Sequence, residues 1–332
     1  MKKPLCVLLG VLMIFPAFVF AGCGQAETLK FGLGVYTNVT AASDATEDAD
    51  GQGKVAITAA AVTVDADGKI VACALDTADI TVKYTAEGKA VANGEFKTKY
   101  EMGTAYNMVA YGGAAKEWFE QADAFEGVVA GKTLDEVKAL VAEGDKGTEE
   151  VITAGCTIMV KEFVLAIEKA YNNAAASNAT AANTLKLGTH TEQSPKDATE
   201  DKDGQNQTET TFFAAAVDAN GKVVAASTEC VQVKFTFDAK GASTYDLTKA
   251  VAGKKEAGTA YNMSAYGTDL NGDGTVKEWN EQAAVFESAC IGKTASEITA
   301  LMADTNYGTA DLQSAGCTIL VNGFVKAAAK IG

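Results

Sequence analysis

Ala154-Gly155-Cys156-Thr157-Ile158 is the stretch on which the fold prediction depends, because it returns unchanged as Ala315-Gly316-Cys317-Thr318-Ile319. An amphipathic pattern follows each copy, and its spacing predicts a helix that begins near the threonine. The apolar face of that helix is formed by Phe163, Val164 and Ile167 in the first copy and by Phe324, Val325 and Ala328 in the second. Each copy therefore closes a long repeated unit.

Other blocks return in the same order upstream of this stretch, so the chain contains two copies of one unit. The units span 29–171 and 185–331, and an Ala, Asn, Ser and Thr segment at 172–184 is typical of a helix tail and linker. At about 145 residues, each unit has the size of a domain. The matched blocks are Asp44–Gly51 with Asp197–Gly204, Gly103–Met108 with Gly258–Met263, Lys116–Trp118 with Lys277–Trp279, and Gly131–Thr133 with Gly292–Thr294.

Within each unit, strand signals precede helix signals. Two β-rich runs flank Asp67-Gly68, and Asn220-Gly221 stands at the same place in the second unit, which predicts a hairpin in each. Alternation over Ile80–Tyr84 and Val233–Phe237 predicts a further strand. Helical spacing then follows, including capping boxes at Thr133 to Glu136 and Thr294 to Glu297. The expected class is α+β, with antiparallel strands followed by C-terminal helices.

Composition excludes several function classes. The 332 residues carry a net charge of −15, and all 28 basic residues are lysine, which disfavours binding to nucleic acid. His190 is the only histidine and has no counterpart in the other unit, which disfavours a histidine-dependent triad or metal site. The cysteines of the body do not recur as a set, so we expect small buried side chains and no disulfide framework.

The first residues have the features of a secretory signal. Lys2 and Lys3 precede an apolar run that ends in Ala21-Gly22-Cys23. This end is similar to a bacterial lipobox, which implies removal of residues 1–22 and lipidation of Cys23. Residues 23–28 then form a short tether, and the protein lies on the extracytoplasmic face of the cell membrane. Ordinary secretion without a lipid is the alternative.

Thr157 and Thr318 are the candidate attachment sites. At a helix start, the unpaired N–H groups and the dipole would hold an anion such as a phosphate without arginine. Gly155 and Gly316 would let backbone approach such a group closely. The alternative is that each threonine is simply the N-cap of a helix that packs on the core.

The hairpin Val-Asp-x-(Asp/Asn)-Gly-Lys-(Ile/Val), together with a late threonine, resembles the FMN-binding domain family. The whole unit, with its Lys-Glu-Trp, Gly-Lys-Thr and Cys-Thr-Ile blocks, resembles the PplA-type flavinylated lipoproteins of Gram-positive extracellular electron transfer. The resemblance implies that a flavin transferase attaches FMN to Thr157 and Thr318 through phosphoesters. The usual acceptor motif is Asp-x-x-Ser/Thr-Gly-Ala-Thr. Here Asp311 to Thr318 has one extra residue, and the first copy begins with Glu150, so Thr153 and Ser314 are alternative acceptors.

Several residues are expected around the two flavins. Aromatic rings could stack on the isoalloxazine, although core packing explains the same rings equally well. Lys116 and Lys277 could pair with the flavin phosphate or lie on a solvated helix face. The remaining expected surroundings are Gly155, Cys156, Gly316, Cys317, Tyr106, Trp118, Tyr261 and Trp279.

The second unit has an insertion that the first lacks. Asp269, Asn271 and Asp273 place oxygen ligands at alternate positions, as in the first half of an EF-hand loop. The twelfth position is Asn280 in place of the usual bidentate Glu. Calcium is therefore a candidate ligand here, and a polar turn is the alternative.

The resemblance implies a membrane-anchored electron carrier with two covalent FMN groups. It would take electrons from a membrane NADH- or quinol-linked reductase and pass them to extracellular flavin or ferric iron. Such a carrier is a redox relay and needs no acid–base pair of its own, because the flavin supplies the chemistry. The sequence shows no nucleophile elbow and so does not favour a hydrolase. The alternative is a surface-binding or calcium-stabilised structural module without flavin.

Overall fold

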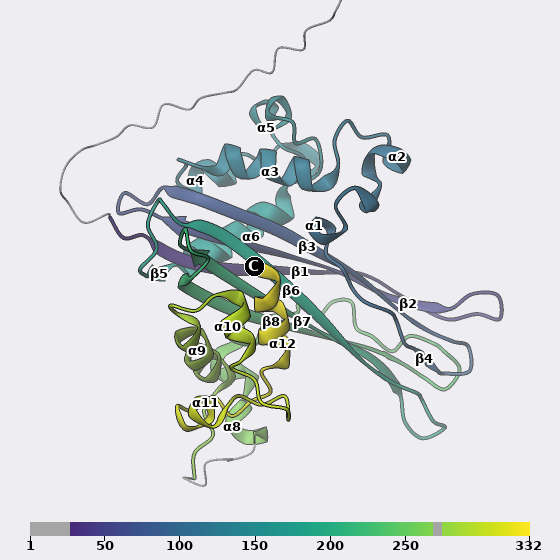
Figure 1. Ribbon diagram of the computed structural model, residues 1–332. Coiled ribbons are helices and arrows are strands. Elements are labelled where there is room, and N and C mark those ends of the chain that lie inside the picture. The colour runs from purple at the N-terminus through teal and green to yellow at the C-terminus, as the bar shows by residue number, and fades with distance from the viewer. Residues whose placement is uncertain (1–26, 268–273) are drawn as a thin grey trace, which may run out of the picture.

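The structure is a computed structural model that describes residues 27–267 and 274–332. It is an α+β protein, as expected, with antiparallel sheets and several helices. Two sheets pack face to face in the middle, and helices cover the outer face of each (Figure 1). The order of layers is thus helices, sheet, sheet, helices.

The first half of the chain builds one sheet and its covering helices. The sheet has the order β4-β3-β2-β1-β5, and every neighbouring pair is antiparallel. The elements are β1 (Lys30–Ser43), β2 (Gly51–Val64), β3 (Ile70–Tyr84), β4 (Ala90–Val91), α1 (Lys99–Met102), η1 (Gly103–Tyr106), α2 (Met108–Gly112), α3 (Trp118–Val129), α4 (Leu134–Lys138), η2 (Glu143–Asp145), α5 (Glu149–Ala154), α6 (Lys161–Asn172) and β5 (Ala175–Ala176).

The second half runs through the same main succession, three long strands and then helices. Its sheet has the order β6-β7-β8 and is also antiparallel. The elements are β6 (Thr184–Lys196), β7 (Gly204–Val217), β8 (Val223–Phe237), α7 (Lys254–Ala257), η3 (Gly258–Tyr261), α8 (Met263–Tyr266), α9 (Trp279–Cys290), α10 (Ala295–Thr299), α11 (Ala310–Ser314), α12 (Asn322–Ala328) and η4 (Ala329–Ile331).

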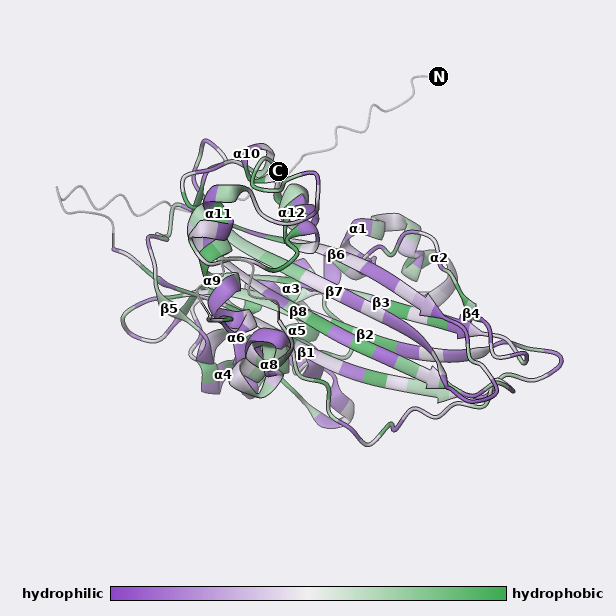
Figure 2. Cartoon of the chain, turned by 90° about the horizontal axis from the view of Figure 1, so that it is seen from below, coloured by the Kyte–Doolittle hydropathy of each residue, from purple (hydrophilic) through white to green (hydrophobic). Residues whose placement is uncertain are grey.

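The central strands β2 and β7 bury apolar side chains on both faces over their C-terminal halves. In β2, Val55, Ile57 and Ala59 face the other sheet, while Ala60 and Val62 face the helices. This pattern of alternating and continuous apolar residues is visible along the strands in Figure 2. The hairpin turns at Asp67-Gly68 and Asn220-Gly221 are confirmed, and each glycine has a positive φ.

The expectation of a separate strand over Ile80–Tyr84 is wrong, because β3 runs unbroken from Ile70 to Tyr84. The polar residues in its middle do not end the strand. Asp76 accepts a hydrogen bond from the backbone N–H of Tyr100, and Asp79 forms an ion pair with Lys99. Both partners lie on α1, so these carboxylates fasten a helix to the strand.

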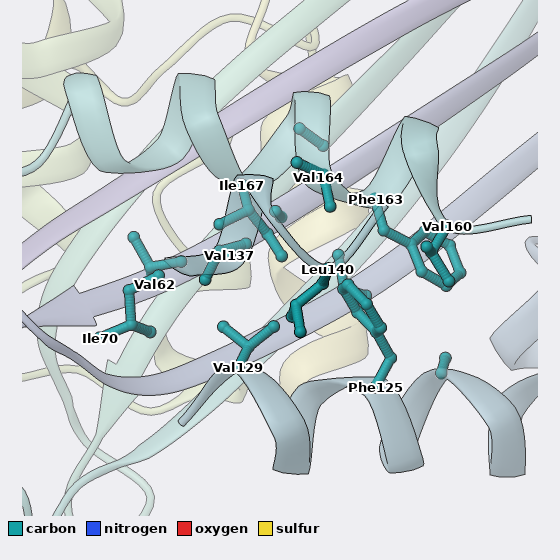
Figure 3. Close-up of a cluster of buried hydrophobic side chains, with 14 of the residues drawn as sticks. Val62, Ile70, Phe125, Val129, Val137, Leu140, Val160, Phe163, Val164 and Ile167 are labelled. Atoms are coloured by element: carbon teal, nitrogen blue, oxygen red, sulfur yellow. The ribbon is translucent and has the colours of Figure 1, made fainter. Parts of the chain in front are cut away.

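Each helical layer packs on its sheet through a compact apolar core. The expected capping boxes at Thr133 and Thr294 are confirmed as the starts of α4 and α10. The side chains of the first layer come from α3, α4 and α6 and meet those of β2 and β3 in Figure 3. Helix α6 lies directly against β1, because Gly32 and Gly34 leave no side chain between the strand and the backbone around Ala170.

The middle core is shared by the two halves. It joins Val35, Ile57 and Ile80 of the first sheet to Phe212 and Phe235 of the second. The segment expected as a linker, 172–184, also docks on this body. It contributes β5, which pairs with β1, and it buries Ala179 in the shared core.

Reciprocal contacts join the two halves at matched positions. Lys169 of α6 pairs with Glu256 at 2.8 Å, and Lys330 after α12 pairs with Glu101 at 2.5 Å. In the same way, the Asp44 carboxylate accepts the N–H of Ser243 at 2.8 Å, and the Asp197 carboxylate accepts the N–H of Ala90 at 2.9 Å. Each half therefore contacts the other through the same kind of surface.

Candidate functional site

Thr157 and Thr318 lie in loops and not at helix starts. Helix α6 begins at Lys161 and α12 at Asn322, four residues beyond each threonine. The expectation that a helix N-terminus holds an anion at these threonines is therefore wrong. Gly155, with φ of 108°, ends α5, and the loop that follows brings Met159 into an isolated bridge with Lys146.

A buried glutamine fixes each threonine. The Gln121 side-chain oxygen accepts hydrogen bonds from the Thr157 N–H at 2.8 Å and from its hydroxyl at 3.0 Å. Gln282 does the same for Thr318, at 2.7 Å and 3.0 Å. Both glutamines are only 1% exposed, and their amide nitrogens donate to the carbonyls of Lys116 and Lys277. The position of each hydroxyl is thus set by a buried side chain whose hydrogen bonds are satisfied.

The repeated Lys-Glu-Trp block connects the other repeated blocks around the threonine. The Lys116 side chain lies over Gly155, where a larger residue would clash with it. The Glu117 carboxylate accepts the N–H groups of Met108 and Val109 at the start of α2. Trp118 is buried against Phe163 in the helical core. The second half repeats the arrangement with Lys277 over Gly316, Glu278 on Met263 and Ser264, and Trp279 against Phe324.

A cavity opens beside each threonine. The first, of about 570 Å³, is lined by Thr157 and by Lys99, Met108, Trp118 and Met159 among others. The second, of about 340 Å³, is lined by Thr318 and by the matched residues Lys254, Met263, Trp279 and Leu320. Both volumes fall in the range that cofactor and small-molecule sites occupy, roughly 300–1,000 Å³.

Lys99 places a cation in the wall of the first cavity. It pairs with Asp79 at 3.1 Å, and its ammonium lies 5.4 Å from the centre of the Tyr106 ring and 5.7 Å from that of Trp118. Burial favours the neutral amine, but Asp79 and Tyr106 outweigh it and hold the pKa of Lys99 above its usual value.

Lys254 holds the same place in the second cavity. It is 8% exposed, pairs with Glu209 at 3.3 Å and lies 5.5 Å from the centre of the Tyr261 ring. Burial would lower the pKa of Lys254, but Cys230 and Glu209 raise it well above the usual value. Sequence reasoning missed both lysines. The available signal was Lys-x-Glu-x-Gly, which stands in both halves at Lys99–Gly103 and Lys254–Gly258.

The other expected surroundings divide into two groups. Tyr261 lines the second cavity, whereas Tyr106 packs against the first helical core beside Lys99. Cys156 and Cys317 are buried in the helical cores, and burial raises the pKa of their thiols to about 11 and about 12. They are therefore packing residues at neutral pH, as the expectation for cysteines predicted. None of the five cysteines in the described residues is in a disulfide.

The alternative acceptors and the remaining candidates lie elsewhere. Thr153 and Ser314 are on α5 and α11 and line neither cavity. Cys23 and the candidate calcium ligands Asp269, Asn271 and Asp273 lie outside the described residues. Within 27–267 and 274–332, no three His, Cys, Asp or Glu side chains are grouped so that they could hold a metal ion.

No helix in the described part of the chain has the length and apolar character needed to cross a membrane. Neither family models, nor curated proteins, nor solved structures show a significant similarity to this chain. The functional argument therefore rests on the two threonine sites themselves.

Proposed function

We propose that this protein is a membrane-anchored, extracytoplasmic flavoprotein that carries one FMN on Thr157 and one on Thr318. In this proposal the chain is a tandem duplication of an FMN-binding-like unit, anchored by a lipid on Cys23. It relays electrons from a membrane NADH- or quinol-linked reductase to extracellular flavin or ferric iron.

The observation that carries the proposal is a threonine hydroxyl held at a cavity by a buried glutamine, found at matched positions in both halves. A threonine that only stabilised the fold would have no need of a cavity beside it. Gln121 fixes Thr157 and Gln282 fixes Thr318, and each cavity has a lysine in its wall. A covalent cofactor needs such a fixed nucleophile beside space for its ring.

The residues present fit a flavin phosphoester. Thr157 is exposed, Thr318 is half-buried, and each threonine lines its cavity. Lys116 and Lys277 lie on the glycines two residues before each threonine, where an ammonium group favours a phosphodiester. The apolar Met159 and Leu320 are 68% and 53% exposed at the cavities and can cover a planar ring. Thr153 and Ser314 line neither of these two cavities.

Attachment by a flavin transferase would use FAD. The threonine oxygen forms the new bond to the FMN phosphorus, the bond from that phosphorus to the bridging oxygen of FAD breaks, AMP leaves with the bridging oxygen, and the hydroxyl proton is lost to solvent. Once the hydroxyl proton has gone, the backbone N–H of each threonine can still donate a hydrogen bond to the side-chain oxygen of Gln121 or Gln282. The bound flavin supplies electron transfer, and the protein supplies its position and electrostatic surroundings.

The test is flavin fluorescence on a denaturing gel. The chain is produced with a flavin transferase, beside Thr157→Ala, Thr318→Ala and the double variant. We expect each single variant to lose about half of the fluorescence and the double variant to lose all of it. Thr153→Ala and Ser314→Ala are the matched controls and should stay bright. A dark wild-type band would contradict the proposal and favour a surface-binding or calcium-stabilised module.

A further inference from the structure

The short helix that carries each cavity lysine is held by several contacts besides the lysine's own ion pair. Lys99 lies at the first position of α1, whose capping box is formed by Thr98 and Glu101. The buried Asp76 accepts the next backbone N–H, from Tyr100, and so holds the helix on β3. Lys330 of the other half pairs with Glu101. The cation is thus fixed by its own half and by the other half.

The same device fixes Lys254. The carboxylate of Glu229 on β8 accepts the N–H groups of Lys255 and Glu256. Lys169 of the first half pairs with Glu256. Rigid support of this kind is what a site needs when the position of a charge matters for its chemistry.

The two halves share the lysine at the cavity wall but differ in the carboxylate that pairs with it. Asp79 is on β3, and the matched position of the second half, Gln232, carries no charge. There the carboxylate comes from Glu209 on β7, a different strand, and it reaches the same lysine. The feature common to both halves is therefore the ammonium group at the cavity wall, and the carboxylate keeps it charged.

We propose that Lys99 and Lys254 set the electron affinity of the ring in each cavity, by placing a positive charge against the ring that receives the electrons. This inference rests on the proposed function. Reduction brings two electrons from a donor, here a membrane quinol, and protons from solvent into the ring. In a chain of net charge −15, the addition of electrons has an electrostatic cost. A cation in a cavity wall that is partly shielded from water offsets this cost locally.

The experiment measures each flavin alone. Thr318→Ala leaves only the first flavin, and the reduced-to-oxidised ratio is read from absorbance against a reference dye during titration with dithionite. At a fixed potential, Lys99→Met should lower that ratio by about tenfold or more, and Lys99→Arg should keep most of it. Asp79→Asn should raise the ratio, because the ammonium group then acts unopposed.

The second flavin provides an independent repeat of the test. In the Thr157→Ala background, Lys254→Met should lower the ratio and Glu209→Gln should raise it. Lys132→Met is the matched control, because Lys132 pairs with Glu150 at 2.9 Å and lines neither cavity.

The outcomes separate this inference from the proposed function. A fluorescent band whose ratio does not move in Lys99→Met overturns the inference and leaves the attachment intact. A shift of the reduced-to-oxidised ratio in the same direction for Lys99→Met and Asp79→Asn would also overturn it. Loss of a positive and loss of a negative charge must shift the ratio in opposite directions, whereas general damage to the structure need not. A dark band in both single-threonine backgrounds removes the proposed function and this inference together.

Discussion

Tyr84, the last residue of β3, stacks on Phe237, the last residue of β8, with ring centroids 4.3 Å apart and planes inclined by 9°. The two residues occupy matched positions in the two halves. Each ring also covers a glycine at the start of the neighbouring strand, Gly51 under Tyr84 and Gly204 under Phe237. This contact closes one end of the shared core, so the halves depend on one another for stability.

Replacement of Tyr84 tests that dependence. Tyr84→Ala should lower the free energy of unfolding by about 3–5 kcal/mol, because it removes a fully buried ring and leaves Phe237 without its partner. Tyr84→Phe keeps the stack and loses only the hydrogen bond to the Ser43 carbonyl, which predicts a loss of about 1 kcal/mol. Urea unfolding followed by circular dichroism measures both. Equal losses for the two variants would contradict the role of the stack.

The close approach of α6 to β1 makes a second prediction. A side chain on Gly34 would meet the backbone of Lys169 and Ala170, which cannot yield without moving the whole helix. Gly34→Ala should therefore destabilise the protein by about 1–3 kcal/mol or more. Gly94→Ala is the matched control, because Gly94 is exposed and has open space around it. If thermal unfolding gave the same midpoint for both variants, the proposed contact would be wrong.

Much of the fold could be predicted because it depends on local signals. Asp67-Gly68 specifies its turn through a glycine with positive φ, and the Thr133 to Glu136 capping box specifies the start of α4. Strand β1 was missed although Phe31, Leu33 and Val35 alternate as a half-buried strand should. Packing of the two sheets against each other could not be predicted, because strands with both faces apolar fit several arrangements.

The site was predicted in part, for a physical reason. The repeated Gly-Cys-Thr stretch identifies Thr157, but the loop that holds this threonine is tied down by a bridge from Met159 to Lys146, which lies before α5. Gln121 contacts Thr157, which is 36 positions away in the sequence. Lys99 contacts Asp79, which is 20 positions away. Such pairs become visible only when the chain is folded, whereas a repeat is visible in the sequence.

The glutamine contacts predict how flavin attachment depends on the positioning of the threonine. Gln121→Leu removes the acceptor for the N–H and hydroxyl of Thr157 and leaves the carbonyl of Lys116 without its donor. We expect flavin incorporation at Thr157 to slow by about tenfold, which corresponds to about 1.4 kcal/mol. The measurement is the rise of in-gel fluorescence with time, in the Thr318→Ala background.

Two controls define the outcome for the glutamine. Gln282→Leu in the same background should have no effect, because it acts on the absent site. A Gln121→Leu variant that unfolds at the same urea concentration and incorporates flavin at the normal rate would show that Gln121 does not position the acceptor.

We expect the two halves to respond differently to pH, because Glu126 and its matched Glu287 have different neighbours, whereas burial raises the pKa of both Asp76 and its matched Glu229. In the first half, burial raises the pKa of Asp76 to about 7 and that of Glu126 to about 8, with Asp123 as a further acidic neighbour. In the second half, Glu287 takes the matched place of Glu126, but Lys255 pairs with it at 2.7 Å. The first half has Tyr100 where the second has Lys255, and its hydroxyl donates to Asp123 at 3.1 Å.

The direction of the pH effect follows from these pKa values. The folded protein binds more protons at Asp76 and Glu126 than the unfolded chain does, so their contribution to stability is complete below about pH 4. It is lost as the pH rises from there through about 8. Tyr100→Lys should supply the missing cation and reduce this loss between pH 5 and 8 by at least about 1 kcal/mol. Lys255→Met should do the opposite, because it removes the cation beside Glu287 and leaves only the hydrogen bonds from Thr228. Urea midpoints at pH 5, 6.5 and 8 measure the slopes, and parallel slopes for the wild type and both variants would contradict this account.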